Sequence, residues 1–408
     1  MQDNEKKPAL RFKGFTDPWE QRKLGEIAVF SKGVGYSKND LCEEGTPIIL
    51  YGRLYTKYET CIFDVDTFVK EKAGGVYSKG GEVIVPASGE TAEDISIASV
   101  VVKPGILLGG DLNIVSPTAE YDSAFLALTI SSGATHKYLS SLAQGKSVVH
   151  LHNADIQSVS AKFPTKREQE KIHLLFGKID TLITLHQRKY EKLVNIKKSM
   201  LDKMFPKNGA SVPEIRFKGF TDLWEQRKLG EIAKEVVRND PASDAPIMMI
   251  TAGNGFIEQS DRYAFNNAGE SLKKYILLER GELAYNHGAS KLRPYGSCFA
   301  LTTVEKARIP FVYHCFSVEK SNPEFLSIEL NGANVENQLR KIVSSGARMD
   351  GLLNIAYSEY TEVTVQLPKK EEQDWIAKFF KHLDTLITLH QREHIKPILE
   401  VKRVKRNE

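Results

Sequence analysis

The hydrophobic positions after Pro164 follow a regular alternation of four- and three-residue steps. The positions on this seam are Ile172, Phe176, Ile179, Ile183, His186, Tyr190, Leu193, Lys197, Met200 and Met204. A stripe with this spacing predicts one long helix that packs against another helix through a coiled-coil seam. Thr165 and Glu168 have the spacing of a capping box, which predicts where that helix begins.

The same steps return near the C-terminus. The second seam comprises Ile376, Phe380, Leu383, Ile387, His390 and His394. Pro397 then stands where the first seam has Leu193, and because proline disrupts a helix interior we expect this helix to be shorter, or bent, after about His394. Two such helices in one chain pair most economically with each other, antiparallel. His186 and His390 occupy equivalent seam positions, where a polar residue fixes helix register.

Short apolar runs alternate with glycine-rich turns in the two long stretches that precede these helices. In the first stretch the runs at residues 82–86 and 100–102 lie between glycine pairs such as those at 74–75, 80–81 and 109–110. Runs of this length bounded by glycine predict strands joined by irregular loops. We therefore expect two α+β globules, similar in frame and different in their loops.

Two sequence elements occur twice, and both point to a duplicated chain. "RFKGFTDPWEQRKLGEIA" at residues 11–28 returns as "RFKGFTDLWEQRKLGEIA" at residues 216–233, with seventeen of eighteen positions identical. "DTLITLHQR" is identical at residues 180–188 and 384–392. Repeats at nearly constant offset indicate duplication of whole domains. The predicted divisions are a first globule at 1–165, a central helix at 166–207, a second globule at 208–368, and a distal helix with a basic tail at 369–408.

The opening repeat has the signals of a short helix. Asp17 is the expected N-cap, with Pro18 at the first helical position and Glu20 in a capping box, and Asp222 with Glu225 repeats the arrangement. Trp19, Leu24 and Ile27 would then face the core. The simplest interpretation of Trp19 and Trp224 is that each anchors this element to its globule.

Charge is distributed unevenly along the 408 residues. Residues 166–207 carry eleven Lys/Arg against five Asp/Glu, and residues 369–408 carry ten against seven, whereas both globules are mildly acidic. A globule that gripped nucleic acid alone would be more basic. Four widely spaced cysteines indicate neither a disulfide framework nor a thiolate zinc site, and the absence of a long apolar run predicts a cytoplasmic protein with no membrane segment.

Three motifs of catalytic or metal-binding type are incomplete. "SNPEF" at residues 321–325 is similar to the loop of adenine methyltransferases, but Glu324 replaces its second proline and no glycine-rich cofactor loop accompanies it. "QGKS" at residues 144–147 lacks the glycine that a phosphate-binding loop requires five places before Gly145. "HLH" at residues 150–152 has no further ligands nearby. No metal site and no catalytic residue is predicted.

The doubled elements resemble the specificity (S) subunit of type I restriction-modification systems. The resemblance rests on W-x4-L-G-E-I, at Trp19 and Trp224, and on P-x3-E-Q, at Pro164 and Pro368, and it covers essentially the whole chain. It implies two similar target recognition domains, separated by two long antiparallel coiled-coil helices in a pseudo-twofold repeat. It also implies a non-catalytic subunit that reads a bipartite, asymmetric double-stranded DNA target.

The resemblance also implies the partners. Two modification (methyltransferase) subunits would dock on the repeated scaffold, and two restriction (translocase) subunits would complete the complex. S-adenosylmethionine, ATP and Mg²⁺ would be bound by those partners, with no cofactor in this chain. The alternatives are a DNA adenine methyltransferase or fused restriction enzyme, based on the SNPEF motif, and a coiled-coil scaffold without a role in DNA binding.

Candidate DNA readers are polar or aromatic residues on loops after strands in the diverged interiors, since such side chains read base edges. In the first domain they are Tyr51, Arg53, Tyr55, Lys57, Tyr58, Ser88, Glu90 and Thr91. In the second they are Thr251, Asn254, Asn286, His287, Ser290, Lys291, Arg293 and Tyr295.

The expected docking surface lies in the repeats, because two identical partners need two similar surfaces. The residues predicted for it are Trp19, Glu20, Arg22, Gln169, Trp224 and Gln373.

Overall fold

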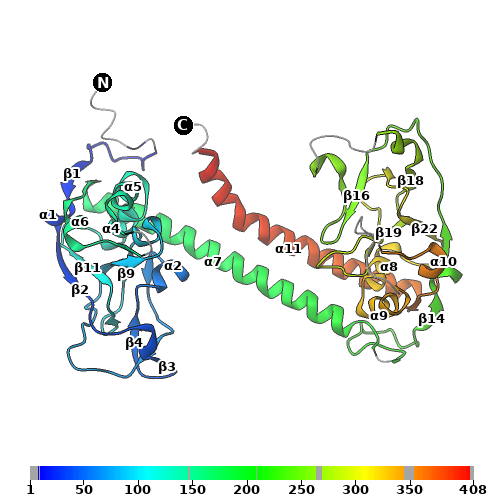
Figure 1. Ribbon diagram of the computed structural model, residues 1–408, viewed down its shortest axis with the longest axis horizontal. Coiled ribbons are helices and arrows are strands. Elements are labelled where there is room, and N and C mark those ends of the chain that lie inside the picture. Colours follow the sequence, from blue (N-terminus) through cyan, green and yellow to red (C-terminus); the bar gives the residue numbers. More distant parts are fainter. Residues whose placement is uncertain are drawn as a thin grey trace. The chain divides into compact units, whose positions relative to one another are not determined.

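The chain folds into two compact units, residues 1–184 and 185–408, in the computed structural model (Figure 1). The structure describes residues 8, 10–145, 148–207, 209–262, 269–343 and 353–404, with residues 393–404 described by their backbone alone. Each unit combines small sheets with helices, which confirms the predicted α+β class.

The first unit is built on a five-stranded sheet of order β2-β11-β7-β9-β5 and a four-stranded sheet of order β10-β4-β6-β3. Its strands are β1 (Glu20–Lys23), β2 (Ala28–Lys32), β3 (Leu41–Cys42), β4 (Thr46–Ile49), β5 (Cys61–Ile62), β6 (Phe68–Val69), β7 (Glu82–Pro86), β8 (Ser88–Gly89), β9 (Ser99–Val101), β10 (Leu107–Leu108), β11 (Leu112–Pro117), β12 (Val149–His150) and β13 (Ser160–Phe163). Its helices are α1 (Leu24–Ile27), η2 (Lys38–Asp40), α2 (Arg53–Thr56), α3 (Ala92–Ile95), α4 (Ser123–Ile130), α5 (Gly133–Leu142), α6 (Asn153–Ser158) and the start of α7 (Lys166–Lys203).

The second unit repeats the centre of this plan. Its main sheet has the order β15-β22-β19-β20, with ribbons β14-β23, β16-β17 and β18-β21. Its strands are β14 (Glu225–Lys228), β15 (Ala233–Glu235), β16 (Met248–Thr251), β17 (Gly255–Glu258), β18 (Ile276–Glu279), β19 (Leu283–Asn286), β20 (Ser297–Ala300), β21 (Lys306–Ile309), β22 (His314–Val318) and β23 (Thr364–Leu367). Its helices are η3 (Leu229–Glu231), η4 (Gln259–Asp261), η5 (Gly269–Lys274), α8 (Pro323–Leu330), α9 (Ala333–Ile342), α10 (Tyr357–Tyr360) and α11 (Lys370–Val404).

The central strands of the two sheets correspond in register as well as in order. In the first sheet Ile114 of β11 lies opposite Ile84 of β7, and in the second Cys315 of β22 lies opposite Ala284 of β19. Both sheets bury their inner face against the helix that follows, α4 or α8, whose Phe125 and Phe325 are core residues. The predicted strand at residues 82–86 is confirmed as β7.

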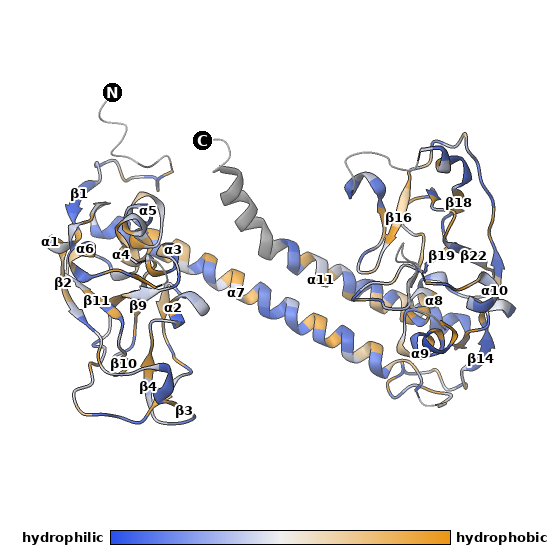
Figure 2. Ribbon diagram, viewed as in Figure 1, coloured by the Kyte–Doolittle hydropathy of each residue, from blue (hydrophilic) through white to orange (hydrophobic). Residues whose placement is uncertain are grey.

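The two long helices carry the predicted seam. Nine positions of the first seam alternate with exposed residues along α7, and Met204 directly follows the helix. All ten except Phe176 are buried or half-buried (Figure 2). Within the second unit, His186 faces His390 with 3.0 Å between their Nδ1 atoms, while Lys197 pairs with Asp384. The residue number of the partner on α11 decreases as the residue number on α7 increases. These parts of the two helices are therefore antiparallel, as predicted.

The opening repeat is not the predicted helix. Residues 20–23 form β1, which pairs antiparallel with β13, and helical backbone covers only Leu24–Ile27. The second copy repeats this with β14, β23 and the single turn η3. Hydrogen bonds to a strand far along the chain outweigh the local capping signal of Asp17 and Glu20. Leu24 and Ile27 face the core as expected.

Pro397 does not end the distal helix. The backbone of α11 is helical from Lys370 to Val404, and it passes through the proline. Proline removes one backbone donor and crowds the preceding turn, which a helix can absorb by bending instead of ending. The last four residues of the basic tail lie outside the described residues.

Candidate nucleic-acid interface

The repeated motifs of each half bind to each other inside their own unit. Arg11 donates from Nε and Nη2 to the carboxylate of Glu168, both at 2.7 Å, and Arg216 does the same to Glu372 at 2.6 and 2.7 Å. Both carboxylates are 1% exposed. Such bidentate, charge-assisted pairs are strong and geometrically specific. Glu168 therefore serves this pair instead of the predicted capping box with Thr165.

The glutamine of each P-x3-E-Q motif is also fully used inside its unit. Gln169 donates from Nε2 to the carbonyl of Pro164 at 2.8 Å, and its Oε1 accepts from the backbone N–H of Asp122 at 2.9 Å. Gln373 makes the same two bonds, to Pro368 and Asn322, each at 2.8 Å. Both side chains are buried. They are thus not accessible to a docking partner, contrary to their predicted place on a docking surface.

The tryptophans of the opening repeat face inward. Trp19 packs edge-on against Phe125 with ring centroids 5.8 Å apart, and Trp224, which is 5% exposed, packs against Phe325 at the same distance. Edge-to-face aromatic pairs of this kind stabilise cores. Each tryptophan anchors the opening repeat to its unit. Trp224 is buried, whereas Trp19 is half-buried and keeps part of its surface exposed.

Exposed charges remain on the opening strands. Glu20 and Arg22 lie on β1, all of whose residues are exposed, and they form an ion pair of 2.8 Å. Glu225 and Arg227 occupy the same places on β14, where Arg227 pairs with Glu231 at 2.6 Å. Of the predicted docking residues, Glu20 and Arg22 are therefore the ones classed as exposed, and Trp19 is half-buried.

In the first unit, the predicted readers after β7 lie beside the segment 149–152, which we call the first strap. Ser88 and Gly89 form β8, which pairs with His150 and Val149 of the strap. Ser88 is buried, whereas Glu90 and Thr91 are exposed at the start of α3, where Thr91 caps the helix by accepting from Asp94 N–H. The polar rim of this unit is thus made by the loop after β7 and the strap together.

Two tyrosines of the other predicted cluster reach this rim. The rings of Tyr51 and Tyr55 are 6.2 Å apart, and a Cβ atom on Gly89 would lie 3.9 Å from the Tyr55 ring. Burial raises the pKa of Tyr55, and the phenol of Tyr51 and the carboxylate of Glu90 add to the shift. Tyr51 and Tyr55 therefore come close to Glu90, which lies far from them in the sequence.

The basic members of the same cluster are already paired. Arg53 donates to Glu59 at 2.8 Å and to Asp66 at 2.6 Å, and only 8% of its side chain is exposed. Lys57 binds the other oxygen of Asp66 at 2.9 Å, and the two cations lower the pKa of that carboxylate to about 2. Arg53 is thus a structural residue here and not a surface donor. Tyr58 is exposed.

In the second unit, the tip of the β16-β17 hairpin lies beside the loop after β19. Asn286 donates from Nδ2 to the carbonyl of Ile250 at 3.1 Å, which joins the two predicted clusters around Thr251 and Asn286. Asn254 is exposed in the hairpin tip. Ser290 and Lys291 are exposed on the loop, where the N–H of Ser290 donates to the carbonyl of Arg293 at 3.0 Å. These residues form the polar rim of the second unit.

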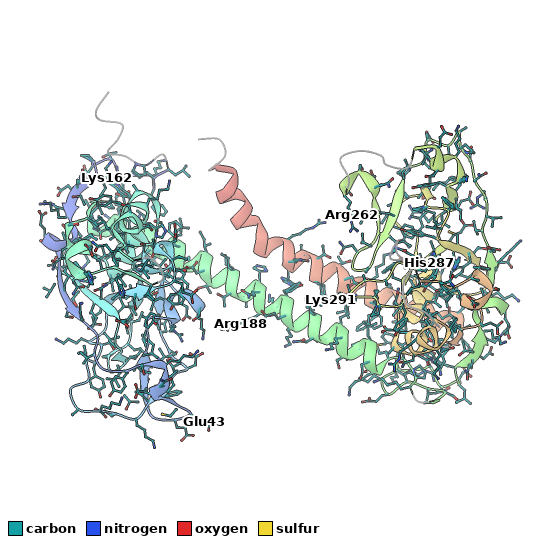
Figure 3. The ribbon with its side chains drawn as sticks, viewed as in Figure 1. Glu43, Lys162, Arg188, Arg262, His287 and Lys291 are labelled. Carbon is teal, nitrogen blue, oxygen red and sulfur yellow. The ribbon has the colours of Figure 1, made fainter. Side chains whose placement is uncertain are left out.

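Three predicted readers of the second unit instead hold this loop in place. Arg293 donates to the carbonyl of Asn331 at 2.6 Å, and burial lowers its pKa. The carbonyl of Tyr295 accepts from the buried Tyr285 hydroxyl at 2.6 Å. His287 is 7% exposed, and Figure 3 places it among packed side chains, whereas Lys291 lies toward an edge of the unit.

Both rims share an element none of whose residues is among the predicted DNA readers. The second strap, residues 353–356, lies against the end of β19 as the first strap lies against the end of β7. Leu151 N–H donates to Ala87 O at 3.0 Å, and Leu353 N–H donates to His287 O at 2.9 Å. The near-constant offset between the halves could have revealed this, because both straps precede the closing strand and the long helix.

The catalytic-type motifs have structural roles. Asn322 of SNPEF is the N-cap of α8 and accepts from Phe325 N–H at 2.9 Å. His150 lies on β12, and His152 is the N-cap residue of α6. In QGKS, residues 146 and 147 lie outside the described residues. Among the described residues, no three His, Cys, Asp or Glu side chains gather so as to hold a metal ion, and no helix is both long and apolar enough to cross a membrane.

Comparison with known proteins agrees with this architecture. The model of the type I restriction modification DNA specificity domain matches residues 16–195. The S subunit of a type I restriction-modification system from M. genitalium has 12% identity and a TM-score of 0.58, over 97% of this chain and 96% of that chain. Comparison with curated protein sequences finds no match.

Two further solved structures are similar at lower scores. The HsdS subunit from Thermoanaerobacter tengcongensis has 15% identity and a TM-score of 0.44, over 95% of this chain and 94% of that chain. A structure that describes complex assembly and conformational transition of the type I R-M system has 14% identity and a TM-score of 0.46, over 96% of each chain.

The chain is a duplicated α+β protein. Each half carries its own polar rim and ends in a long helix. The M. genitalium S subunit shares this fold along almost its whole length. Residues 16–195 match the model of the type I restriction modification DNA specificity domain, and the whole chain has a fold similar to that of the M. genitalium S subunit.

Proposed function

We propose that this chain is the non-catalytic subunit that reads a bipartite, asymmetric DNA target, one half-site by each unit. The observation that carries the proposal is the contrast between frame and rim. Arg11–Glu168 and Arg216–Glu372 are the same bond in both halves, whereas Glu90 and Thr91 on one rim correspond to Ser290 and Lys291 on the other. The two units share one scaffold but differ in the polar residues of their rims. This combination suits two units that read two different DNA half-sites in the same manner.

The proposed readers are the exposed or half-exposed rim residues, because base edges are read by hydrogen-bonding and stacking side chains. In the first unit they are Tyr51, Tyr55, Tyr58, Glu90, Thr91, His150 and His152. In the second they are Thr251, Asn254, Ser290 and Lys291. This set has few free cations, and phosphate contacts supply much of the affinity of DNA-binding proteins. Partner subunits would provide those contacts.

The proposed partners are two modification subunits, joined by two restriction subunits. Each modification subunit would dock on one copy of the opening strand, since Glu20 and Arg22 on β1 and Glu225 and Arg227 on β14 present the same exposed charges. S-adenosylmethionine, ATP and Mg²⁺ would be bound by these partners. We propose that the complex works in the bacterial cytoplasm, where its DNA lies.

Domain exchange tests the proposal. Residues 31–160 are replaced by the corresponding stretch of a relative with a different target, and genome methylation is profiled with the modification subunit present. One half of the methylated sequence should change and the other should stay. A change in both halves, or in neither, would exclude independent reading by the two units. The purified chain alone, given DNA and a labelled methyl donor, should transfer no methyl group.

A further inference from the structure

A polar side chain stands at the same place in both central sheets, buried in the case of Asn113 and half-buried in the case of His314. Asn113 on β11 lies opposite Val85 of β7, and His314 on β22 lies opposite Tyr285 of β19. Gly-Glu occurs at residues 81–82 and again at residues 281–282, at corresponding places in the two halves. Val85 and Tyr285 each lie three residues after that glutamate, so they correspond. Asn113 and His314 are therefore equivalent positions, although the surrounding sequences have diverged.

Both side chains bond to the strap carbonyl that directly precedes the N-cap residue of the next helix. Asn113 Nδ2 donates to Leu151 O at 2.8 Å, and His314 Nε2 lies 3.0 Å from Ile355 O. Leu151 directly precedes His152, the N-cap residue of α6, and Ile355 directly precedes Ala356, the N-cap residue of α10. A carbonyl accepts only, so His314 must donate from Nε2. Two different residue types thus make one bond at one place.

The bond to the strap explains why these two strand positions hold polar residues, although apolar residues would otherwise be favoured there. Asn113 is fully buried, and its Oδ1 has no hydrogen-bond partner among the described residues. An unsatisfied buried acceptor costs about 1–3 kcal/mol. Valine or leucine at this strand position would avoid that cost. The bond to the strap is the contact that an apolar residue could not replace.

The second strap has an additional contact. His287 Nδ1 lies 2.8 Å from Leu353 O, and its Nε2 lies 2.8 Å from Val312 O. A neutral imidazole has one N–H, so it donates to one of these carbonyls at a time. In the first unit the place of His287 is taken by Ala87, and the pairing of β8 with β12 holds the strap instead. The matched bond is therefore that of Asn113 and His314.

We propose that Asn113 and His314 are positioning residues, each of which fixes its strap against the rim and so sets how stringently its unit reads its half-site. The inference rests on the proposed function, since it assumes that each rim reads DNA. Neither side chain would touch DNA. Loss of the bond would loosen the rim of one unit and leave the other unit unchanged.

The test uses the chain co-purified with its modification subunits, after the target has been found by methylation profiling. The variants are Asn113→Ala, His314→Ala, His314→Asn and Asn113→His, with Glu329→Gln as a control that alters a buried polar group on α8. Initial methylation rates are measured on the target and on duplexes with one base changed in either half-site. Their ratio gives the discrimination of each unit.

His314→Ala should lower discrimination at one half-site roughly tenfold, which is the loss of one hydrogen bond of about 1.4 kcal/mol, and leave the other half-site unchanged. Asn113→Ala should do the same at the opposite half-site. His314→Asn, which supplies the donor found in the first unit, should restore discrimination to within about threefold. Equal losses at both half-sites, no loss in either alanine variant, or failure of asparagine to restore the loss would overturn the proposal.

Hydrogen exchange of the same complexes without DNA separates this inference from the proposed function. Leu353 N–H is bonded to His287 O, so its exchange reports on the second strap. Exchange there should accelerate at least tenfold in His314→Ala, stay slow in His314→Asn, and leave Leu151 in the first strap unaffected. If the native complex reads no bipartite target but this pattern holds, the proposed function fails and the strap bond stands. Unchanged exchange in His314→Ala overturns the strap bond itself.

Discussion

Glu329 on α8 is a carboxylic acid in the core of the second unit. It is 3% exposed, and its Oε1 accepts from Gln366 N–H at 3.0 Å. Burial raises the pKa of its carboxyl group from 4.5 to about 7, against the opposing effect of that hydrogen bond. The equivalent residue of the first unit is Thr129, whose hydroxyl donates to Phe125 O at 2.8 Å. The two units thus differ in how their stability should depend on pH.

Glu329→Gln should stabilise the second unit at pH 8 but not at pH 5. The folded state holds a proton that the unfolded chain releases above pH 4.5, so native stability falls as pH rises from 4.5 through 7. A shift of this size corresponds to on the order of 3 kcal/mol at pH 8. Urea unfolding at both pH values measures it, with Thr129→Val as a control whose effect should not vary with pH. A pH-independent effect of Glu329→Gln would contradict the prediction.

Arg11→Ala should destabilise the first unit by about 3–5 kcal/mol, because it leaves the buried carboxylate of Glu168 without its cation. The double variant Arg11→Met with Glu168→Leu removes both charges and should recover most of that loss. Amide exchange across β13 measures the stability of this unit. Arg216→Ala is the matched control, since it should affect β23 and not β13. Equal losses in the single and double variants would show that the pair acts by shape alone.

Single residues also show why the site was only partly predictable. Arg53 has the type and loop position of a DNA reader, and the sequence alone does not show that the chain turns to bring Glu59 and Asp66 against it. Gln169 was expected at a surface because it is repeated, yet its repetition reflects bonds to Pro164 and Asp122. Repetition reveals that a residue is needed, and only its contacts reveal why.

Among the elements, those with a long local period were predictable and those held by distant partners were not. The seam residues of α7 and α11 recur every three or four positions, so the sequence predicts both helices and their antiparallel pairing. Strand β1 forms because β13, about 140 residues later, supplies its backbone partners. The straps likewise depend on strands far away in sequence. No local pattern records such pairings.

The histidine pair at the seam should show non-additive energetics. His186→Leu removes the Nδ1 partner of His390 and leaves a polar ring in the seam, so it should destabilise the helix pair by about 1 kcal/mol. His186→Leu with His390→Leu makes this level apolar and should be at least as stable as the native chain. Thermal unfolding of the two single variants and the double variant gives the coupling energy. Additive effects would mean that the two rings do not act as a pair.

At the scale of the whole molecule, the repeated surface should set the number of partners. Charge reversal of Glu20 and Arg22 on β1 should reduce assembly from two modification subunits to one, and further reversal of Glu225 and Arg227 should abolish it. Light scattering of the co-purified complex gives the stoichiometry. Reversal of Lys273 and Glu270, an exposed pair on η5, is the control. Unchanged two-to-one assembly in the fourfold variant would exclude the opening strands as the docking surface.

The bonds between Arg11 and Glu168 and between Arg216 and Glu372 have a consequence for heredity. Each bond joins an arginine near the start of a half to a glutamate near its end. The same two residue types, Arg and Glu, make the bond in both halves. A genetic crossover inside the repeated stretch would therefore hand either half a foreign interior while leaving its closing bond intact. Such recombinants should fold at once, so new DNA targets would arise by reshuffling genes faster than by accumulating point mutations.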